Sequence, residues 1–583
     1  MLVNMRSLEP IYTESAECQD CYKCLRQSTA KAIKIQQGHA KVIPELCILC
    51  GHCVRVCPVG AKRVRNDIER AKLLLKTRER VIVSLAPSYV TELGDFETAR
   101  IIRAFKKLGF YGVSETAIGA QEVSANTAEM MAKDRSGTFI SSACPTVVEL
   151  IKKYHPRYAH SVVNFLSPLL AHTKLLRAEF GEDIGVVFAG PCIAKKTEAD
   201  NHPQLLDAAL TFEELRQWWQ AEGIDPGAAE PCSDDVWLLG SSEEGALYPI
   251  DGGMIATVKS SCTVSDAQFM AFSGVEAVRD VIDELDKLGG QGPLFLELLA
   301  CKGGCVNGPC MQKQGATAVK RHWVISSSQY RPQVIPRRAR LDVTGSWQIE
   351  AVGRQEYPES RIRAALTRVG KFRKEDELNC SGCGYDSCRA FAQALLDGRA
   401  EPSMCLGYMR QLAHKKADAL IRTIPCGAVI VNENLQVVES NRRFAELCGP
   451  EAVSIFQARP GLENASLAKL VPYSRIFEQV LSQGCEKIEK DVKFDGKFLH
   501  ITVFTIEAHR YVGAILQDIT EPAAQKERII KKSRELMRKN VETVQKIAYL
   551  LGESAADSEV ILNSITESFS AEELDDDNRT DNG

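Results

Sequence analysis

The sequence lacks the features of membrane and exported proteins. Its 583 residues contain no uninterrupted apolar run of about 18 residues, the length that a membrane-spanning helix needs. Residues 1–17 contain no apolar stretch between basic and small residues, so no export signal is expected. The formal net charge is only -4, which argues against a nucleic-acid partner. We therefore predict a cytoplasmic protein that binds neither membrane nor nucleic acid.

Cysteine, in contrast, is abundant. The chain has 21 cysteines, and in a reducing compartment such residues bind metals more often than they form disulfides. Hydrophobic residues make up 45% of the chain, which is enough to form the cores of about four domains. The spacing of the cysteines is therefore the first guide to function.

The N-terminal segment 1–78 carries two runs of cysteines spaced as in bacterial ferredoxins with two four-iron clusters. The first run is Cys18, Cys21 and Cys24, and the second is Cys47, Cys50, Cys53 and Cys57. In the ferredoxin topology the last cysteine of each run binds the other run's cluster, so Cys57 is predicted to complete the first cluster. A zinc module is the alternative, because zinc also accepts four thiolates.

The second cluster lacks its expected fourth thiolate. The matching position is Ser28, which leaves Cys47, Cys50 and Cys53 with three outcomes: a serine-oxygen ligand, a three-iron cluster or an unstable site. Oxygen is a harder donor than sulfur, so even a serine-bound cluster should have a shifted reduction potential.

Three further cysteine motifs occupy the segment 79–371. They are Ala143-Cys144-Pro145, Pro191-Cys192 followed by Ile193-Ala194-Lys195-Lys196-Thr197-Glu198, and Cys301-Lys302-Gly303-Gly304-Cys305. Thiolate is the ligand that iron prefers, and four thiolates complete a cubane cluster. In order and content these motifs resemble the active-site signatures of [FeFe]-hydrogenases, the iron-only hydrogenase large-subunit family.

This resemblance implies an H-cluster, in which a four-iron cubane is joined to a diiron centre carrying CO and cyanide. It makes Cys144, Cys192, Cys301 and Cys305 the cubane ligands, with Cys305 as the bridge to the diiron centre. It also places Lys195 beside a cyanide, with Glu198 as its companion, and Ser88 in the wall of the diiron pocket. An ammonium can donate to a buried anion, as the Lys195 role requires.

Several positions depart from the family pattern. In fast members the residue before the first cluster cysteine is a cysteine that passes protons, and here it is Ala143, whose methyl group cannot relay a proton. Gly190 and Leu299 stand where catalytic members commonly have methionine, and Cys310 adds a spare thiol. A site with its iron ligands but without its proton path suits the detection of hydrogen better than its rapid turnover.

The segment 372–411 carries a further quartet, Cys380, Cys383, Cys388 and Cys405. It resembles a small four-iron module of electron-transfer and corrinoid proteins, and the third cysteine opens an expected helix over residues 389–396. A structural zinc site is again the alternative.

The C-terminal part has a different pattern. Alternating strands over residues 412–522 resemble a PAS domain, a sensor and dimerisation module whose own ligand is unknown. Over residues 523–569, Ile530, Met537, Val544 and Leu551 recur every seven residues, which predicts a signalling helix that pairs with a second copy or packs on the PAS domain. The acidic residues 570–583 are expected to be disordered.

The predicted fold is therefore multidomain α/β: a ferredoxin-like module, an H-cluster α/β domain on parallel strands, a small 4Fe-4S domain, a PAS α+β domain and a C-terminal helix. The predicted function is a sensory [FeFe]-hydrogenase that oxidises H2 slowly and relays its redox state to the PAS domain. The alternatives are a catalytic hydrogenase that exchanges electrons with ferredoxin, and an iron-sulfur scaffold without a diiron centre.

The predicted partners follow from this function. They are H2, ferredoxin or another redox protein, a second copy through the PAS domain and C-terminal helix, maturation proteins, and a downstream kinase, phosphatase or regulator. No kinase or phosphatase signature occurs in the chain itself, so an output has to pass to another protein.

Overall fold

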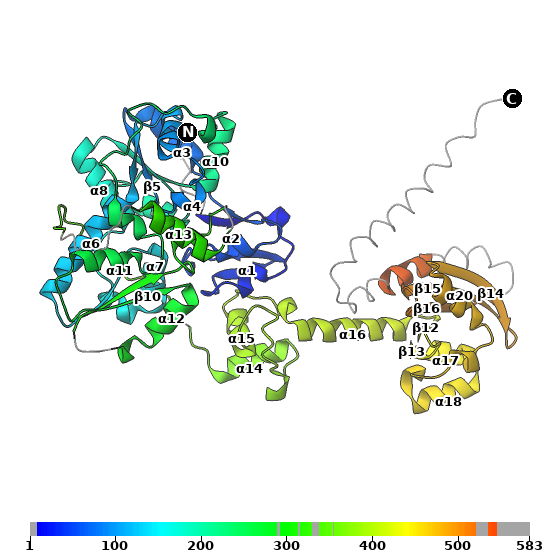
Figure 1. The fold of residues 1–583 in the computed structure, drawn as a ribbon. Coiled ribbons are helices and arrows are strands. Elements are labelled where there is room, and N and C mark those ends of the chain that lie inside the picture. Colours follow the sequence, from blue (N-terminus) through cyan, green and yellow to red (C-terminus); the bar gives the residue numbers. More distant parts are fainter. Residues whose placement is uncertain are drawn as a thin grey trace, which may run out of the picture. The chain divides into compact units, whose positions relative to one another are not determined.

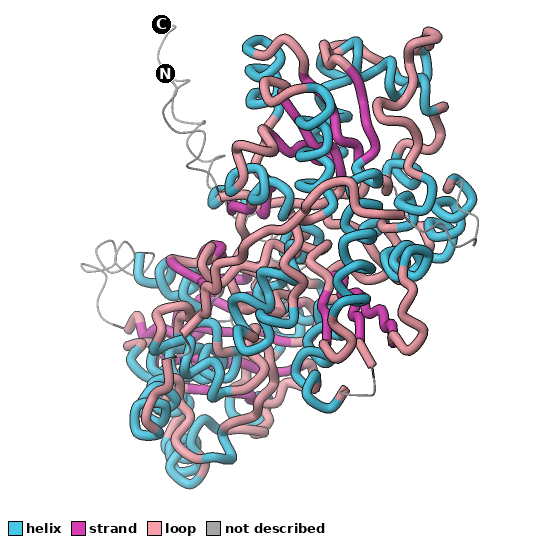
Figure 2. The backbone as a smooth tube through the Cα atoms, turned by 90° about the vertical axis from the view of Figure 1, so that its left-hand side faces the viewer, coloured by secondary structure: helices cyan, strands magenta, loops and turns pink. Residues whose placement is uncertain are grey.

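The computed structural model describes residues 9–288, 292–312, 315–328, 337–353, 355–520 and 535–544. The chain divides into two compact units, residues 1–402 and 403–583. Helices and strands are mixed in both units, as Figures 1 and 2 show. The predicted multidomain α/β class is confirmed.

The first unit opens with a module of short elements. Strand β1 (Ile11–Thr13) pairs with β4 (Lys62–Val64), and β2 (Ile33–Gln36) pairs with β3 (His39–Val42), both antiparallel. Gln37 and Gly38 join β2 to β3 with positive φ angles of 53° and 73°, the backbone that a two-residue hairpin turn needs. Helices α1 (Lys23–Arg26) and α2 (His52–Val56) each carry a predicted cluster cysteine, Cys24 and Cys53 respectively.

Two parallel sheets form the core of this unit. One has the order β6-β5-β8-β9, with β5 (Val81–Leu85), β6 (Gly112–Glu115), β8 (Gly185–Gly190) and β9 (Ala208–Thr211). The other has the order β10-β11-β7, with β7 (Thr138–Ile140), β10 (Gln268–Ser273) and β11 (Leu294–Leu299). Every residue of β5, β8 and β11 is buried, as expected for parallel strands covered on both faces. The predicted core of parallel strands is confirmed.

Helices are interspersed with these strands in the first unit (Figure 1). They are α3 (Ile68–Thr77), α4 (Tyr89–Glu92), α5 (Thr98–Lys107), α6 (Thr116–Lys133), α7 (Pro145–Tyr154), α8 (Pro168–Phe180), α9 (Ala194–Asn201), α10 (Phe212–Ala221), α11 (Gly253–Ser261), α12 (Val275–Asp283) and α13 (Thr317–Ser327). Local sequence sets several of their starts: Ser167 caps α8 ahead of Pro168, and Thr211 with Glu214 forms a capping box at α10.

A small helical segment completes the first unit. Helices α14 (Glu359–Arg368) and α15 (Cys388–Leu396) pack together through Ile362, Leu366 and Ala392. Helix α15 begins one residue before the predicted start of the helical stretch, with Ser387 as its cap.

The second unit is built on one antiparallel sheet with the order β13-β12-β16-β15-β14. Its strands are β12 (Gly427–Asn432), β13 (Val437–Ser440), β14 (Lys487–Phe494), β15 (Lys497–Glu507) and β16 (Tyr511–Asp518). Its helices are α16 (Leu406–Thr423), α17 (Arg442–Cys448), α18 (Pro450–Ala458), α19 (Leu467–Leu470) and α20 (Arg475–Gln483). The predicted α+β arrangement is present, although the predicted boundary between residues 411 and 412 falls inside α16.

The two faces of this sheet are covered differently. Ile501 and Val503 point into the core shared with α17 and α20, whereas Phe504 lies on the opposite face, as the two-residue period of a strand requires. That opposite face contacts the described part of the C-terminal helix, residues 535–544, through Val541 and Val544. Val541 and Val544 thus pack on the sheet of their own chain, and pairing of the helix with a second copy stays a prediction. Ile530, Leu551 and residues 570–583 lie outside the described residues.

Among the described residues, no helix is both long and apolar enough to cross a membrane.

Candidate metal centres

The four cysteines predicted to hold the H-cluster lie at the carboxyl ends of parallel strands. Cys144 follows β7 and precedes α7, Cys192 joins β8 to α9, and Cys301 comes two residues after β11. Cys305 follows a tight loop in which Gly304 has φ 97°, and a Cβ there would lie 2.3 Å from the Pro249 oxygen. Because the carboxyl ends of parallel strands are where α/β folds place functional groups, both sheets deliver ligands to one region.

Most of the predicted site residues line one cavity of about 100 Å³. Its wall includes Ser88, Ala143, Cys144, Cys192, Lys195, Leu299, Cys301 and Cys305. These residues come from positions more than 200 apart in the chain, so only folding brings them together. Glu198 lies next to the cavity through its contact with Lys195.

The four cysteines are half-buried in the cavity wall, and their thiols affect one another. Burial raises the pKa of Cys144, and raises that of Cys192 to about 11. Burial and the neighbouring thiols also raise the pKa values of Cys301 and Cys305. Thiolates so close together repel one another, and bound iron would both displace their protons and relieve that repulsion. The donor set therefore fits an iron-sulfur cluster.

Lys195, which is predicted to lie beside the diiron group, lines the cavity. Its Nζ donates to Glu198 Oε2 at 2.7 Å and to Ser167 Oγ at 3.0 Å. The Lys195 and Glu198 side chains are only 10% and 11% exposed, so their attraction is weakly screened. An ammonium has three N–H donors, which leaves one beyond these two bonds for an anion in the cavity.

Two buried hydroxyls near the cavity have no hydrogen-bond partner among the described residues. They belong to Ser88 and Ser142, each 1% exposed. Burying a hydroxyl without a hydrogen-bond partner costs free energy, so each of these hydroxyls could donate to an acceptor on a bound group. Ser88 lines the cavity, which fits a group with anionic ligands bound there.

The departures from the family pattern also lie around this cavity. Ala143 lines it in place of the proton-passing cysteine, and Leu299 lines it in place of a methionine. At Gly190 a Cβ would lie 2.3 Å from the Phe188 ring, so Phe188 occupies the space that a larger residue would take. Cys310 is buried and its backbone N–H donates to Pro191, but its side chain does not line the described cavity.

Two wall residues were missed from the sequence. Glu297 is 1% exposed, accepts bonds from the N–H groups of Gly252 and Ile255, and has its pKa raised to about 7 by burial. Tyr248 lines the cavity and shares a 2.8 Å hydrogen bond with Ser124. A charged residue inside the apolar strand Leu294–Leu299 is the signal that could have identified Glu297.

The N-terminal cysteines surround a buried lysine. Lys62 is 3% exposed, and its Nζ donates to the Ala40 oxygen at 2.8 Å and to Thr13 Oγ1. Burial lowers the pKa of Lys62, and four thiols act in the opposite direction: Cys24, Cys53, Cys18 and Cys57. These thiols belong to both predicted clusters, so the Lys62 ammonium is close to both sites.

We expect Lys62→Met to lower the reduction potentials of both N-terminal clusters, on the order of 50 mV each. A buried positive charge stabilises the more negative, reduced cluster, and methionine removes that charge while keeping most of the side-chain volume. Redox titration followed by electron paramagnetic resonance (EPR) would measure both potentials. The exposed Lys41→Met variant is the control, and unchanged potentials in Lys62→Met would contradict the prediction.

Ser28 is already engaged in a local hydrogen bond. Its Oγ accepts from the Ala32 N–H at 3.2 Å. Because this bond gives the hydroxyl a structural role, we expect a three-iron cluster on Cys47, Cys50 and Cys53. Ser28→Cys should then add one iron atom per chain and abolish the three-iron EPR signal of the oxidised protein. An unchanged iron content would indicate that the site already holds a complete cluster.

The second N-terminal site adjoins the large cavity. The Cys50 thiol is close enough to Cys301 to raise its pKa. Gly51 has φ 71°, and a Cβ there would lie 2.4 Å from Pro309 and 2.9 Å from Ile193, which precedes α9. The loop between Cys50 and Cys53 therefore packs directly on two loops of the H-cluster site.

The small helical segment contacts the other side of the N-terminal module. Lys31 Nζ donates to the Gly384 oxygen at 2.9 Å and pairs with Asp386 at 3.3 Å. Gly384 directly follows Cys383, one of three cysteines of the quartet in the first unit. Cys405 caps α16 in the second unit, so the complete quartet stays a prediction.

No three His, Cys, Asp or Glu side chains among the described residues are arranged around a single metal ion. The ligands of a four-iron cluster stand further apart than those of one ion.

Comparison with known proteins agrees with this geometry. Residues 79–309 match the family described as iron only hydrogenase large subunit, C-terminal domain. These residues are therefore similar to that family's hydrogenase domain. Residues 40–63 match a 4Fe-4S binding domain, and residues 376–406 match a putative Fe-S cluster family. The predicted iron-sulfur clusters and H-cluster are thereby supported as cofactors, while the individual ligands stay predictions.

The hydrogenase domain has characterised relatives. Iron hydrogenase 1 of Clostridium pasteurianum is 25% identical over 43% of this chain and 53% of its own length. The NADP-reducing hydrogenase subunit HndD of Solidesulfovibrio fructosivorans is 24% identical over 45% of this chain and 55% of its own. A structure of HydA1 from Chlamydomonas reinhardtii covers 47% of this chain and 91% of that chain, at 17% identity and a TM-score of 0.35. The chain thus spans about half the length of the curated relatives.

Proposed function

We propose that this chain is a sensory [FeFe]-hydrogenase that binds H2 and oxidises it slowly. The proposal rests on the position of Ala143. Its methyl group lies in the wall of the cavity that also contains the predicted iron ligands and Lys195. A proton leaving this cavity finds no thiol at the position where fast enzymes have one. Slow turnover leaves the site in a hydrogen-dependent redox state for longer, which suits detection.

The H-cluster would be held by Cys144, Cys192, Cys301 and Cys305 and, when bound, supplies the heterolytic splitting of H2. The residues around it have separate tasks. Lys195 holds a positive charge at the cavity, and Glu198 orients its ammonium. Ser88 offers an unpartnered hydroxyl to an anionic ligand. Apolar wall residues such as Leu299 keep bulk water out.

Oxidation of one H2 releases two protons and two electrons, and each electron needs a one-electron acceptor. The contact between the Cys50 loop and the Cys301 region supports a path into the N-terminal clusters. Lys62 is close to thiols of both N-terminal clusters, which supports electron transfer from one cluster to the other. The contact of Lys31 with Gly384 supports a further step towards the Cys380–Cys388 segment. A ferredoxin or another redox protein would accept the electrons at the end.

The second unit would be the output. Its five-stranded antiparallel sheet, with α17 and α20 on one face, suits a PAS domain, as the sequence suggested. We propose that the redox state of the clusters biases this domain, which then acts on a separate kinase, phosphatase or regulator. A second copy of the chain and the maturation proteins that insert the diiron centre are further proposed partners.

Infrared spectroscopy of anaerobically matured protein tests this function. Bands of CO and cyanide that change between hydrogen and inert gas, together with slow turnover, are expected. Absence of these bands after verified maturation would leave an iron-sulfur scaffold. Fast turnover in the native chain would instead favour the ferredoxin-linked enzyme.

A further inference from the structure

Helix α9 presents two functional faces. Lys195 and Glu198, three residues apart, meet each other beside the cavity. Lys196 and Asp200, four residues apart, form ion pairs with residues that do not line the cavity. Residues three or four apart share one side of a helix, so consecutive lysines face different surroundings.

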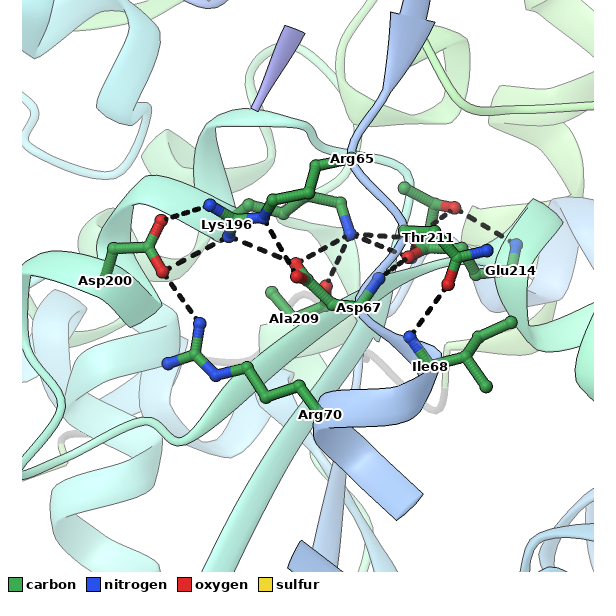
Figure 3. Close-up of polar contacts among 10 residues, drawn as sticks. Arg65, Asp67, Ile68, Arg70, Lys196, Asp200, Ala209, Thr211 and Glu214 are labelled. Atoms are coloured by element: carbon green, nitrogen blue, oxygen red, sulfur yellow. Dashed lines mark hydrogen bonds and ion pairs between the residues drawn. The ribbon is translucent and has the colours of Figure 1, made fainter. Parts of the chain in front are cut away.

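The second face is held by buried ion pairs, drawn in Figure 3. The Lys196 side chain is fully buried, and its Nζ donates to Asp67 Oδ2 at 3.0 Å, to Glu214 Oε2 at 2.9 Å and to the Ala209 oxygen at 2.9 Å. All three N–H donors of the ammonium are therefore satisfied. Glu214 also accepts from the Asp67 N–H, which ties the two carboxylates into one network.

The network reaches the N-terminal module. Arg65 lies one residue after β4, and donates to Asp67 Oδ1 at 2.9 Å and to Asp200 Oδ2 at 2.8 Å. Arg70 donates to Asp200 Oδ1 at 2.7 Å. The charges of the three cations and the three carboxylates thus cancel. Each of these six side chains is at least three-quarters buried.

Apolar packing contributes little to the placement of α9. The helix has eight residues, and Ala194 and Ala199 are its buried apolar side chains. Two alanines bury too little surface, at about 25 cal/mol per Å², to fix the rotation of a helix about its axis. Directional contacts at Lys196 and Asp200 decide that rotation, and with it the direction in which Lys195 points.

We infer that Lys196 is a positioning residue for Lys195: its buried ion pairs with Asp67 and Glu214 set the rotation of α9 and so hold the Lys195 ammonium at the cyanide side of the diiron group. This inference rests on the proposed function. It also means that the junction after β4, at the end of the cluster-bearing module, takes part in shaping the hydrogen site.

The test compares infrared spectra of matured native protein with those of Lys196→Gln and Lys195→Gln. We expect Lys196→Gln to shift or split the cyanide bands in the direction seen for Lys195→Gln, because a turned helix withdraws the same ammonium. Lys371→Gln is the matched control: Lys371 is also buried and donates to the backbone oxygen of Asp376, but lies far along the chain in another segment. A residue that only stabilises the fold would lower the melting temperature and leave the bands unchanged.

A second pair of variants guards against misfolding. Lys196→Gln with Asp67→Asn removes one charge of each sign, so less uncompensated buried charge is left. Asp200→Asn loosens the end of α9 at a side chain that is 24% exposed. Native cyanide frequencies in both of these proteins would overturn the inference, whereas shifted frequencies in either would support it. If the native protein itself lacks CO and cyanide bands, the proposed function fails instead.

Discussion

Ala143→Cys should raise the rate of hydrogen turnover about 100-fold. A positioned acid-base group contributes roughly 100- to 10,000-fold to a proton transfer, and we take the low end because only one member of the path is restored. Ala143 already lines the cavity beside Cys144, so its new thiol would lie where the proton must leave. Hydrogen production from a reduced dye, measured on protein with matched CO and cyanide band intensities, gives the rate per active site.

The control for this variant is Ala120→Cys. Ala120 also lines the cavity and is 1% exposed, but comes from α6 and does not precede a cluster ligand. An additional thiol alone should leave the rate within about twofold of native, in contrast to the 100-fold expected above. Equal rates for native protein and both variants would mean that proton transfer does not limit turnover, and the case for a sensor would lose its main support.

Cys305→Ala should abolish the CO and cyanide bands and all hydrogen-dependent activity. The predicted bridge to the diiron centre is lost, and alanine offers no other ligand. Infrared spectra, iron content and hydrogen uptake would be measured on protein matured under the same conditions. The expected loss is complete, to the background of each assay.

Cys310→Ala is a well-matched control for Cys305→Ala. Cys310 is buried and Cys305, five residues before it, is half-buried, but only Cys305 lines the cavity. Cys310→Ala should therefore keep the native bands, with only the modest destabilisation of a small buried deletion, about 1 kcal/mol. The reverse result, loss of bands in Cys310→Ala alone, would move the bridging role to the spare thiol.

Parts of the fold followed from local pattern. The strands β5, β7 and β8 coincide with short apolar runs of the sequence, because buried parallel strands are short and almost wholly apolar. The helical stretch from residue 389 was likewise placed to within one residue, since Ser387 provides a cap. The packing of residues 535–544 stayed open between two alternatives, because a heptad stripe does not say which surface it covers.

The candidate site divides in the same way. Cysteine spacing and motif order indicated iron-sulfur sites at Cys18–Cys57 and an H-cluster at Cys144–Cys305. Such sites can be recognised because the type of ligand and the short spacing between ligands are visible in the sequence. Glu297 and Tyr248 were missed because their approach to the cavity depends on how β11 and the turn after Leu247 pack, for which no spacing rule exists.

The sequence by itself determined which functional groups the chain carries. They are cysteines spaced as in iron-sulfur proteins, a lysine three residues after Cys192, and an alanine where a proton-passing cysteine is expected. Only the tertiary structure decided how these pieces meet. It placed residues from both sheets around one cavity, packed Gly51 against Pro309, and set the fully buried Lys196 between Asp67 and Glu214. Each of these contacts joins residues at least 18 positions apart, and neither periodicity nor local propensity carries information at that range, so packing alone could reveal them.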